Sequence, residues 1–271
     1  MFESPVKTRD LILFSLFSLM IIFYIFLSSF FDQRTKIVFC NVGQGDAAYI
    51  RIKNKIDVLI DAGPDKSVLS CLGKYMPFWD RKIELAFLSH PNSDHYNGYL
   101  HIADRYKIDK FITVKSPFTS KTYKKLLENI SIKQIPLSFA VSGDRFQAGN
   151  SLFKVYWPPK DLSSSNDNDF SSVILFKGML FTGDVSAFVL GRLSHGAIGK
   201  VNILKVPHHG SKNGLIKTFL DLADPSIAVI SVGKSNFYGH PNKQTLDMLK
   251  AKNVKVLRTD EEGDIVFNLI E

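Results

Sequence analysis

Five of the seven histidines in this chain of 271 residues lie in three short motifs, and a fourth motif supplies an aspartate. Imidazole and carboxylate side chains at this density are typical ligands of divalent metal ions. Packing alone does not require such residues at four separate places, so the pattern predicts a metal site. The motifs are Ser89-His90-Pro91-Asn92-Ser93-Asp94-His95, Phe181-Thr182-Gly183-Asp184, Val206-Pro207-His208-His209-Gly210-Ser211 and Tyr238-Gly239-His240-Pro241.

The first three motifs each follow a short apolar run that is typical of a buried strand. Because α/β proteins gather their sites at the carboxyl ends of strands, we expect these motifs to meet at one sheet edge, with His90, Asn92, Asp94 and His95 on a tight loop before a helix. The predicted strands are 36–41, 47–52, 56–61, 83–89, 110–114, 152–157, 172–176, 179–183, 202–206, 227–232, 254–258 and 264–269. The predicted helices are 66–75, 98–106, 120–129, 187–193, 215–222 and 243–252.

The N-terminal region divides into a short tail, residues 1–10, and an uncharged apolar segment, residues 11–31. In a helix, 21 residues rise about 31 Å, which matches the hydrocarbon core of a bilayer. A cleaved signal peptide has a shorter apolar core, followed by a cleavage site of the Ala-x-Ala type. This segment is longer and has no such site. We therefore predict an uncleaved, single-pass membrane anchor. The flanking charges are balanced, and the short tail favours a body outside the cytoplasm.

The net charge of +8 belongs to residues 32–271, because the charged residues before them cancel. A basic body favours polyanionic partners such as nucleic acid, anionic lipid or a wall polymer, although it is also compatible with solubility alone. Only two cysteines occur, Cys40 and Cys71. This number excludes a disulfide framework and a zinc-thiolate site. We expect two buried free thiols, with a single bridge as the alternative for an exported body.

The motifs together resemble those of the metallo-β-lactamase fold superfamily and, within it, the hydrolase domain of ComEC-type DNA-uptake proteins. The matching segments run in family order through residues 36–269: 39–47 (FCNVGQGDA), 59–63 (LIDAG), the 90–95 motif, 168–173 (NDFSSV), 181–184, 206–211, 236–241 (NFYGHP) and 258–263. The resemblance implies an α/β protein, an αββα metallo-β-lactamase sandwich over residues 36–271, preceded by one N-terminal transmembrane helix. Such relatives also contain a many-span channel region, so we expect a separate channel protein as a partner.

The resemblance also implies which residues surround the metal. Its ligand candidates are His90, Asn92, Asp94, His95, Asp184, His208 and His209. Asp61 is expected to orient a ligand imidazole, and the turn formed by Gly43 and Gly45 is expected to bring Gln44 and Asp46 near the site. The remaining candidates for substrate or leaving-group contacts are Ser171, Ser211, Lys212, Asn236, Tyr238 and His240.

Two departures from the family pattern affect the expected metal content. Asn92 stands where the family loop has histidine or aspartate, and Ser171 and Ser172 lie where many members supply a further histidine. We therefore expect one firm ion at Asp94, His95, Asp184 and His209, and a looser second ion near His90. Oxygen-rich sites suit Mn²⁺ better than sites of three imidazoles do, so the expected cofactor is one or two divalent ions, Zn or Mn.

The predicted function is a membrane-anchored metal-dependent hydrolase, a phosphodiesterase or nuclease acting on DNA during its uptake or degradation. Metal-bound water would be the nucleophile. Asp94 would orient it or accept its proton, and His240, with His208 and Lys212 as alternatives, would protonate the leaving oxygen. The alternatives are a phosphorylcholine or wall-polymer phosphodiesterase and a non-catalytic DNA-binding module with a degenerate metal site. A β-lactamase is disfavoured because the missing imidazoles are those its zinc site needs.

Overall fold

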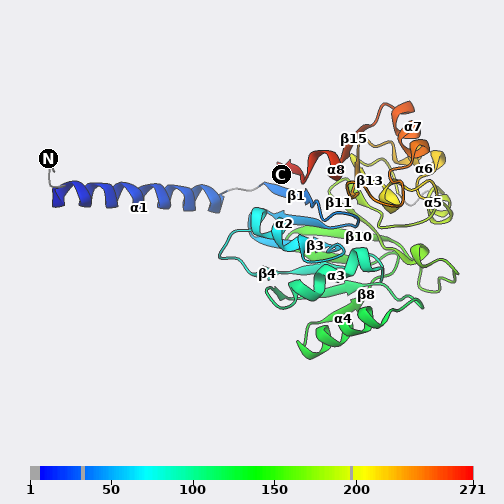
Figure 1. The fold of residues 1–271 in the computed structure, drawn as a ribbon, viewed down its shortest axis with the longest axis horizontal. Coiled ribbons are helices and arrows are strands. Elements are labelled where there is room, and N and C mark those ends of the chain that lie inside the picture. Colours follow the sequence, from blue (N-terminus) through cyan, green and yellow to red (C-terminus); the bar gives the residue numbers. More distant parts are fainter. Residues whose placement is uncertain (1–6, 32–33, 196–197, 271) are drawn as a thin grey trace.

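The computed structural model describes residues 7–31, 34–195 and 198–270, and it separates a long helix from a layered body (Figure 1). Helix α1 (Thr8–Phe31) projects away from the body and exposes its apolar side chains from Leu11 to Ile25. Its window Thr8–Ile25 is long and apolar enough to cross a membrane. The predicted anchor, residues 11–31, lies within this helix. Residues 1–6 of the predicted tail lie outside the described residues.

Two seven-stranded sheets form the centre of the body. The first has the order β16 (Ile265–Leu269), β1 (Thr35–Phe39), β2 (Ala48–Ile52), β3 (Ile56–Ile60), β5 (Leu85–Phe87), β7 (Phe111–Thr113) and β8 (Leu137–Phe139). The second has the order β15 (Lys255–Arg258), β14 (Ile227–Ile230), β13 (Ile203–Lys205), β12 (Met179–Phe181), β11 (Val173–Phe176), β10 (Ser151–Trp157) and β9 (Arg145–Ala148). A small parallel pair joins β4 (Lys82–Ile83) to β6 (Lys107–Ile108).

Side-chain alternation along the strands builds three apolar layers. In β1, Ile37 and Phe39 pack between the sheets, whereas Val38 faces the helices on the outer side. The helices over the first sheet are α2 (Ser67–Tyr75), α3 (Ser93–Ile102) and α4 (Lys121–Ile132). Those over the second are α5 (Ala187–Leu193), α6 (Lys217–Ala223) and α7 (Lys243–Ala251), and the short α8 (Thr259–Glu262) follows β15. The predicted αββα sandwich is therefore confirmed.

Helix α3 begins at Ser93, five residues before the predicted start at Gly98. Asp94 and His95 thus lie in the first turn of a helix rather than on a loop. Gly98 does not mark a helix start: a Cβ atom there would lie 1.9 Å from the carbonyl oxygen of Ala62. The glycine allows α3 to approach the end of β3, which explains why its low helix propensity is tolerated. Strands β6, β8 and β9 were not predicted, because they are short or lie at exposed sheet edges, and the predicted strand 83–89 is divided between β4 and β5.

The expectation of two free thiols is wrong, because Cys40 and Cys71 form a disulfide with their Cα atoms 5.8 Å apart. Cys40 follows β1, and Cys71 lies on the buried face of α2. Both residues have the low exposure expected of buried thiols, so burial did not distinguish the two states. The bridge fastens α2 to the first sheet.

We predict that removing this bridge destabilises the body by about 3–4 kcal/mol, the chain-entropy value for closing a loop of this length. The expected result is a lower urea midpoint for the Cys40→Ser/Cys71→Ser variant of the detergent-solubilised chain. Reductant should lower the midpoint of the parent chain to the same value and leave the variant unchanged. A parent midpoint that is insensitive to reductant would contradict the prediction.

Candidate metal centre

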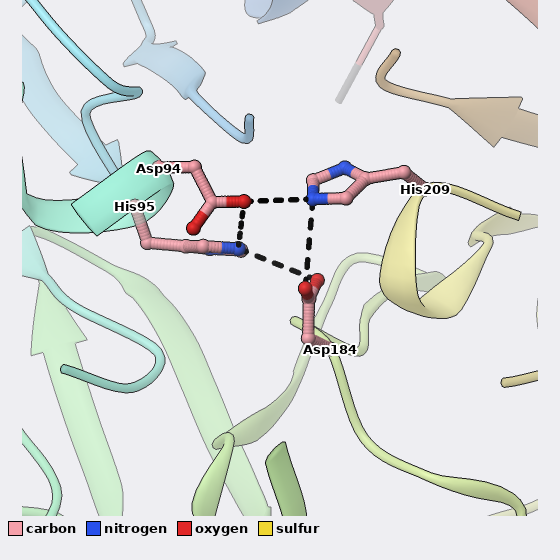
Figure 2. A group of neighbouring side chains, drawn as sticks. All are labelled: Asp94, His95, Asp184 and His209. Atoms are coloured by element: carbon pink, nitrogen blue, oxygen red, sulfur yellow. Dashed lines mark hydrogen bonds and ion pairs between the residues drawn. The ribbon is translucent and has the colours of Figure 1, made fainter. Parts of the chain in front are cut away.

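Four of the predicted ligands converge where the two sheets meet (Figure 2). Asp94 and His95 come from the start of α3, after β5 of the first sheet. Asp184 follows β12, and His209 follows β13 within a short 3-10 turn, Pro207–Gly210, so these two come from the second sheet. We call Asp94, His95, Asp184 and His209 the central cluster. Each offers one ligand atom within 4.8 Å of the others.

The distances inside the central cluster suit a shared cation. His95 Nε2 lies 3.3 Å from Asp184 Oδ1, and His209 Nε2 lies 3.2 Å from Asp94 Oδ2 and 3.5 Å from Asp184 Oδ2. His95 Nε2 and Asp184 Oδ1 are buried, and neither makes a hydrogen bond. Buried polar atoms without partners are costly, and a metal ion would satisfy both. The donor set, two imidazoles and two carboxylates, therefore fits a divalent ion.

Both imidazoles of the central cluster are oriented by hydrogen bonds at their Nδ1 atoms. His95 Nδ1 lies 2.8 Å from Asp61 Oδ2, and Ser89 donates its backbone N–H and its hydroxyl to the same carboxylate. His209 Nδ1 donates to the carbonyl oxygen of Ser231 at 2.9 Å. With Nδ1 occupied in this way, each ring directs Nε2 into the centre. Asp61 thus contacts the imidazole of His95 on the side away from the centre.

His90 borders the central cluster as a separate potential ligand. Its ring lies 4.3 Å from that of His95, and its buried Nε2 has no hydrogen-bond partner. Burial, reinforced by the charge of His95, lowers the pKa of His90 to about 3. His90 is therefore neutral at pH 7 and keeps a lone pair for a metal. The side-chain amide of Asn92 donates from Nδ2 to Asn168 Oδ1 at 3.3 Å.

His208 and His209 sit on a turn of unusual backbone conformation. Both have positive φ, 51° and 53°, and Gly210 follows at 79°. A Cβ atom on Gly210 would lie 2.7 Å from Cβ of Pro241, so the close approach of the 236–241 loop requires this glycine. The turn sends His209 into the centre and leaves His208 half-buried, with its Nε2 3.9 Å from Asp184 Oδ2.

The loop with His240 lies beside His208, and the two rings are 5.7 Å apart. The Nδ1 atom of His240 is buried and makes no hydrogen bond. Asn236 braces this loop: its amide donates to two carbonyl oxygens and accepts the backbone N–H of His240. Tyr238 is exposed, and its ring stacks on His240.

The other residues that the sequence predicted near the site lie around the central cluster. Asp46 is buried and lies 3.4 Å from His209 Nδ1, and Gln44 Oε1 accepts the backbone N–H of Gly233. Ser171 Oγ accepts the backbone N–H of Asp184. Ser211 is buried, its hydroxyl accepting the N–H of Asn213, whereas Lys212 is exposed.

Sequence reasoning missed Lys205, the last residue of β13. Its buried ammonium group contacts Asp46, donates to the carbonyl oxygen of Gly183 at 2.9 Å and lies 3.7 Å from Asp184 Oδ1. Burial alone would lower the pKa of Lys205, but the charges of Asp46 and Asp184 outweigh it and raise the pKa. The sequence signal that could have found it is a lysine inside the apolar run Ile203-Leu204-Lys205-Val206, because a buried lysine needs an acidic partner.

Three comparisons bear on the family. The model of the metallo-beta-lactamase superfamily matches residues 40–234. The chain is 26% identical to ComE operon protein 3 of Bacillus subtilis, and the match covers 91% of this chain and 34% of the relative. It is also 26% identical to Recombination protein 2 of Haemophilus influenzae, and that match covers 85% of this chain and 28% of the relative. It thus spans about a third of the length of these relatives. Igni18, a metallo hydrolase from Ignicoccus hospitalis, has the same fold, with a TM-score of 0.57 and 16% identity over 87% of this chain and 100% of that one.

We predict that metal affinity rises with pH. Burial disfavours the charged form of His209, but the carboxylates of Asp184, Asp46 and Asp94 outweigh this and raise its pKa to about 10. The pKa of His95 also lies well above its usual range, because Asp184 and Asp61 outweigh burial. Metal must displace these protons, so affinity should increase about tenfold per pH unit for each proton released.

Calorimetric titration with Zn²⁺ or Mn²⁺ between pH 6 and 8, in buffers of different ionisation enthalpy, measures both affinity and proton release. The His209→Ala variant should release fewer protons and bind more weakly. The His101→Ala variant, which changes an exposed histidine of α3, should behave as the parent chain. An affinity that does not change with pH would contradict the prediction.

Proposed function

The chain belongs to the metallo-beta-lactamase superfamily, and from this premise we propose that it is a membrane-anchored, metal-dependent phosphodiesterase that cleaves DNA. The observation that carries the proposal is the central cluster, in which His95 Nε2 and Asp184 Oδ1 are buried and make no hydrogen bond. Beside it stand three further histidines, His90, His208 and His240. A hydrolase of this superfamily needs such a centre and groups around it that can move protons.

The central cluster would hold the firm ion, and His90 with Asp184 would hold a looser second one. A divalent ion, Zn²⁺ or Mn²⁺, supplies a Lewis acid and a water of lowered pKa when it is bound. Asp94 is the most exposed carboxylate of the cluster, with 31% of its side chain accessible, so it can reach an incoming water. We propose that Asp94 orients this water and accepts its proton.

His240 is the proposed partner of the leaving oxygen. Its unpartnered Nδ1 and its position beside His208 give it a free polar atom near the centre. Burial, together with the charge of His208, lowers the pKa of His240. The ring is therefore neutral at pH 7 and would donate a hydrogen bond from N–H as charge develops on the leaving oxygen.

Exposed aromatic residues beside the centre favour nucleic acid as the substrate. Phe237 is fully exposed, and Tyr238 next to it is 72% exposed and stacked on His240. Proteins that hold single-stranded nucleic acid combine positive charge with aromatic rings on which bases stack. The body carries the net charge of +8. The two curated relatives, named for the ComE operon and for recombination, support the same substrate class.

We place the body outside the cytoplasm, anchored by α1. The disulfide between Cys40 and Cys71 supports this side of the membrane, because structural disulfides persist in oxidising compartments. External DNA would then be the substrate encountered. A separate channel protein would carry DNA across the membrane in this proposal.

We predict that the Asp184→Ala variant loses nuclease activity by at least about a hundredfold, since changes even to groups behind metal ligands commonly cost tenfold to a hundredfold. The assay uses linear and circular DNA with Mn²⁺, Zn²⁺ and Mg²⁺ in turn, and metal content is measured in parallel. Asp247→Ala is the matched control, because Asp247 is an exposed carboxylate on α7 paired only with Lys243 among the described residues.

Two results would overturn the nuclease proposal. If the parent chain and Asp184→Ala bind DNA but are equally inert with every metal, the body is a non-catalytic DNA-binding module. If the parent chain releases choline or phosphate from wall polymer and leaves DNA intact, the substrate is a wall polymer.

The aromatic residues give a second test. We predict that Phe237→Ala/Tyr238→Ala raises KM for single-stranded DNA roughly 5- to 30-fold, equivalent to about 1–2 kcal/mol of lost base stacking. Hydrolysis of methyl p-nitrophenyl phosphate, which is too small to span the loop and the metal centre, should keep its kcat. Phe237→Tyr/Tyr238→Phe, which retains both rings, should keep the parent KM. Unchanged KM for DNA in the alanine variant would contradict the stacking role.

A further inference from the structure

An aromatic pair lies in the loop that leads to the amino-terminal ends of β4 and β5, whereas the candidate metal ligands Asp94 and His95 follow the carboxyl-terminal end of β5. Phe78 and Trp79, in the loop between α2 and β4, are 80% and 64% exposed. Their rings meet edge to face, 4.8 Å apart. Large apolar side chains exposed together mark interaction surfaces. We call residues 77–80 the aromatic loop.

The aromatic loop is braced at its base. Asp80 accepts the guanidinium N–H of Arg51 at 3.0 Å and the backbone N–H of Lys82 at 3.2 Å, and its own N–H donates to Pro77. Arg51 is itself buried and paired with Asp57. The two rings are therefore presented to solvent by a fixed support.

The aromatic loop lies close to the start of the body. Lys36, the second residue of β1, is the register partner of Arg51, and Arg51 is paired with Asp80. Only residues 32–34 separate β1 from α1, so the four Cα–Cα steps from Phe31 to Thr35 span about 14 Å at most. Figure 1 shows this loop on the side of the body from which α1 departs. A bilayer crossed by α1 would therefore face this edge.

A cavity of about 420 Å³ lies next to the aromatic loop, lined by Leu69, Gly73, Arg81, Arg105 and Tyr106. Both arginines are exposed, and Arg81 contacts the ring and hydroxyl of Tyr106. In the part of the chain that the structure describes, no carboxylate lies within ion-pair distance of either guanidinium group. Guanidinium groups bind phosphate through paired N–H donors.

We propose that this edge docks on the bilayer that α1 spans, with Phe78 and Trp79 in the interfacial layer and Arg81 and Arg105 on the phosphates of anionic phospholipids. Aromatic residues at the headgroup level and basic residues near an anionic surface are the two components of such docking. The proposal rests on the membrane anchoring in the proposed function, and it is independent of the nuclease activity. It fixes the body with its metal centre directed away from the membrane.

The test uses the full chain reconstituted in vesicles of phosphatidylcholine alone or with a quarter phosphatidylglycerol, each containing brominated lipid that quenches tryptophan at the interface. The chain has two tryptophans, and Trp157 is buried with its N–H bonded to Asp169, so Trp79 is the accessible reporter. We expect quenching in the parent chain, strongest with phosphatidylglycerol, and its loss in Trp79→Phe.

The Arg105→Gln and Arg81→Gln variants test the phosphate contacts. In anionic vesicles each should lower the ratio of inserted to free loop about fivefold, and in neutral vesicles each should have little effect. Arg192→Gln, on α5 across the sandwich, is the matched control and should behave as the parent chain.

The outcomes separate the two proposals. If the chain does not float with the vesicles, the anchor is wrong and the docking proposal falls with it. If the chain floats but Trp79 is not quenched, the docking proposal alone is overturned. Equal quenching in neutral and anionic vesicles overturns the contacts of Arg81 and Arg105 with anionic lipid. Cleavage of a small soluble diester should be unchanged in all of these variants.

Discussion

The structure of the site depends on how buried negative charge is compensated. The carboxylates of Asp46, Asp61 and Asp184 lie out of solvent at the junction of the two sheets, with Asp94 at their rim. Buried carboxylates are costly unless positive groups and hydrogen bonds surround them. Lys205 supplies one fixed charge, which Asp46 and Asp184 share. The remaining negative potential must be met by protons on the histidines or by a metal ion, which makes this centre the candidate cation site.

Neither sheet carries this centre alone. The first sheet and its helices deliver Asp61, Asp94 and His95, whereas the second delivers Asp184, Lys205 and His209. The interlocking hydrogen bonds, such as that between His209 and Asp94, cross from one sheet to the other. We therefore expect metal binding to depend on packing of the sandwich, because the candidate ligands come within reach of one another only when the apolar layer between the sheets is formed.

The ends of the strands could be predicted from the sequence more completely than the residues and helices that pack around them. Short apolar runs followed by His or Asp indicated the ends of β12 and β13, after which Asp184 and His209 lie, because a buried strand and a polar edge differ sharply in composition. Lys205 was missed because a lysine within a buried strand is not part of the usual apolar pattern. Its burial is explained by the ion pair with Asp46, which lies far away in the sequence. The start of α3 was misplaced because Gly98 is required by a contact with Ala62, which lies far away in the sequence. The disulfide between Cys40 and Cys71 was only the alternative prediction, because the sequence pattern of burial is the same for a free thiol and for a bridged cysteine.

The strands of the first sheet run so that the connection to α1 and the candidate metal centre lie at opposite ends of these strands. β1, β3 and β5 share one direction, since β2 is antiparallel to both β1 and β3, and β3 is parallel to β5. Their amino-terminal ends hold the connection to α1 and the aromatic loop. Their carboxyl-terminal ends lead to Asp61 and to the His90–His95 motif. In β1 and β3, five strand residues separate these ends by about 17 Å. In the proposed arrangement, a bilayer at the first end would leave the second end open to solvent, and a long polyanion would reach the candidate metal centre without crossing an anionic lipid surface that repels it.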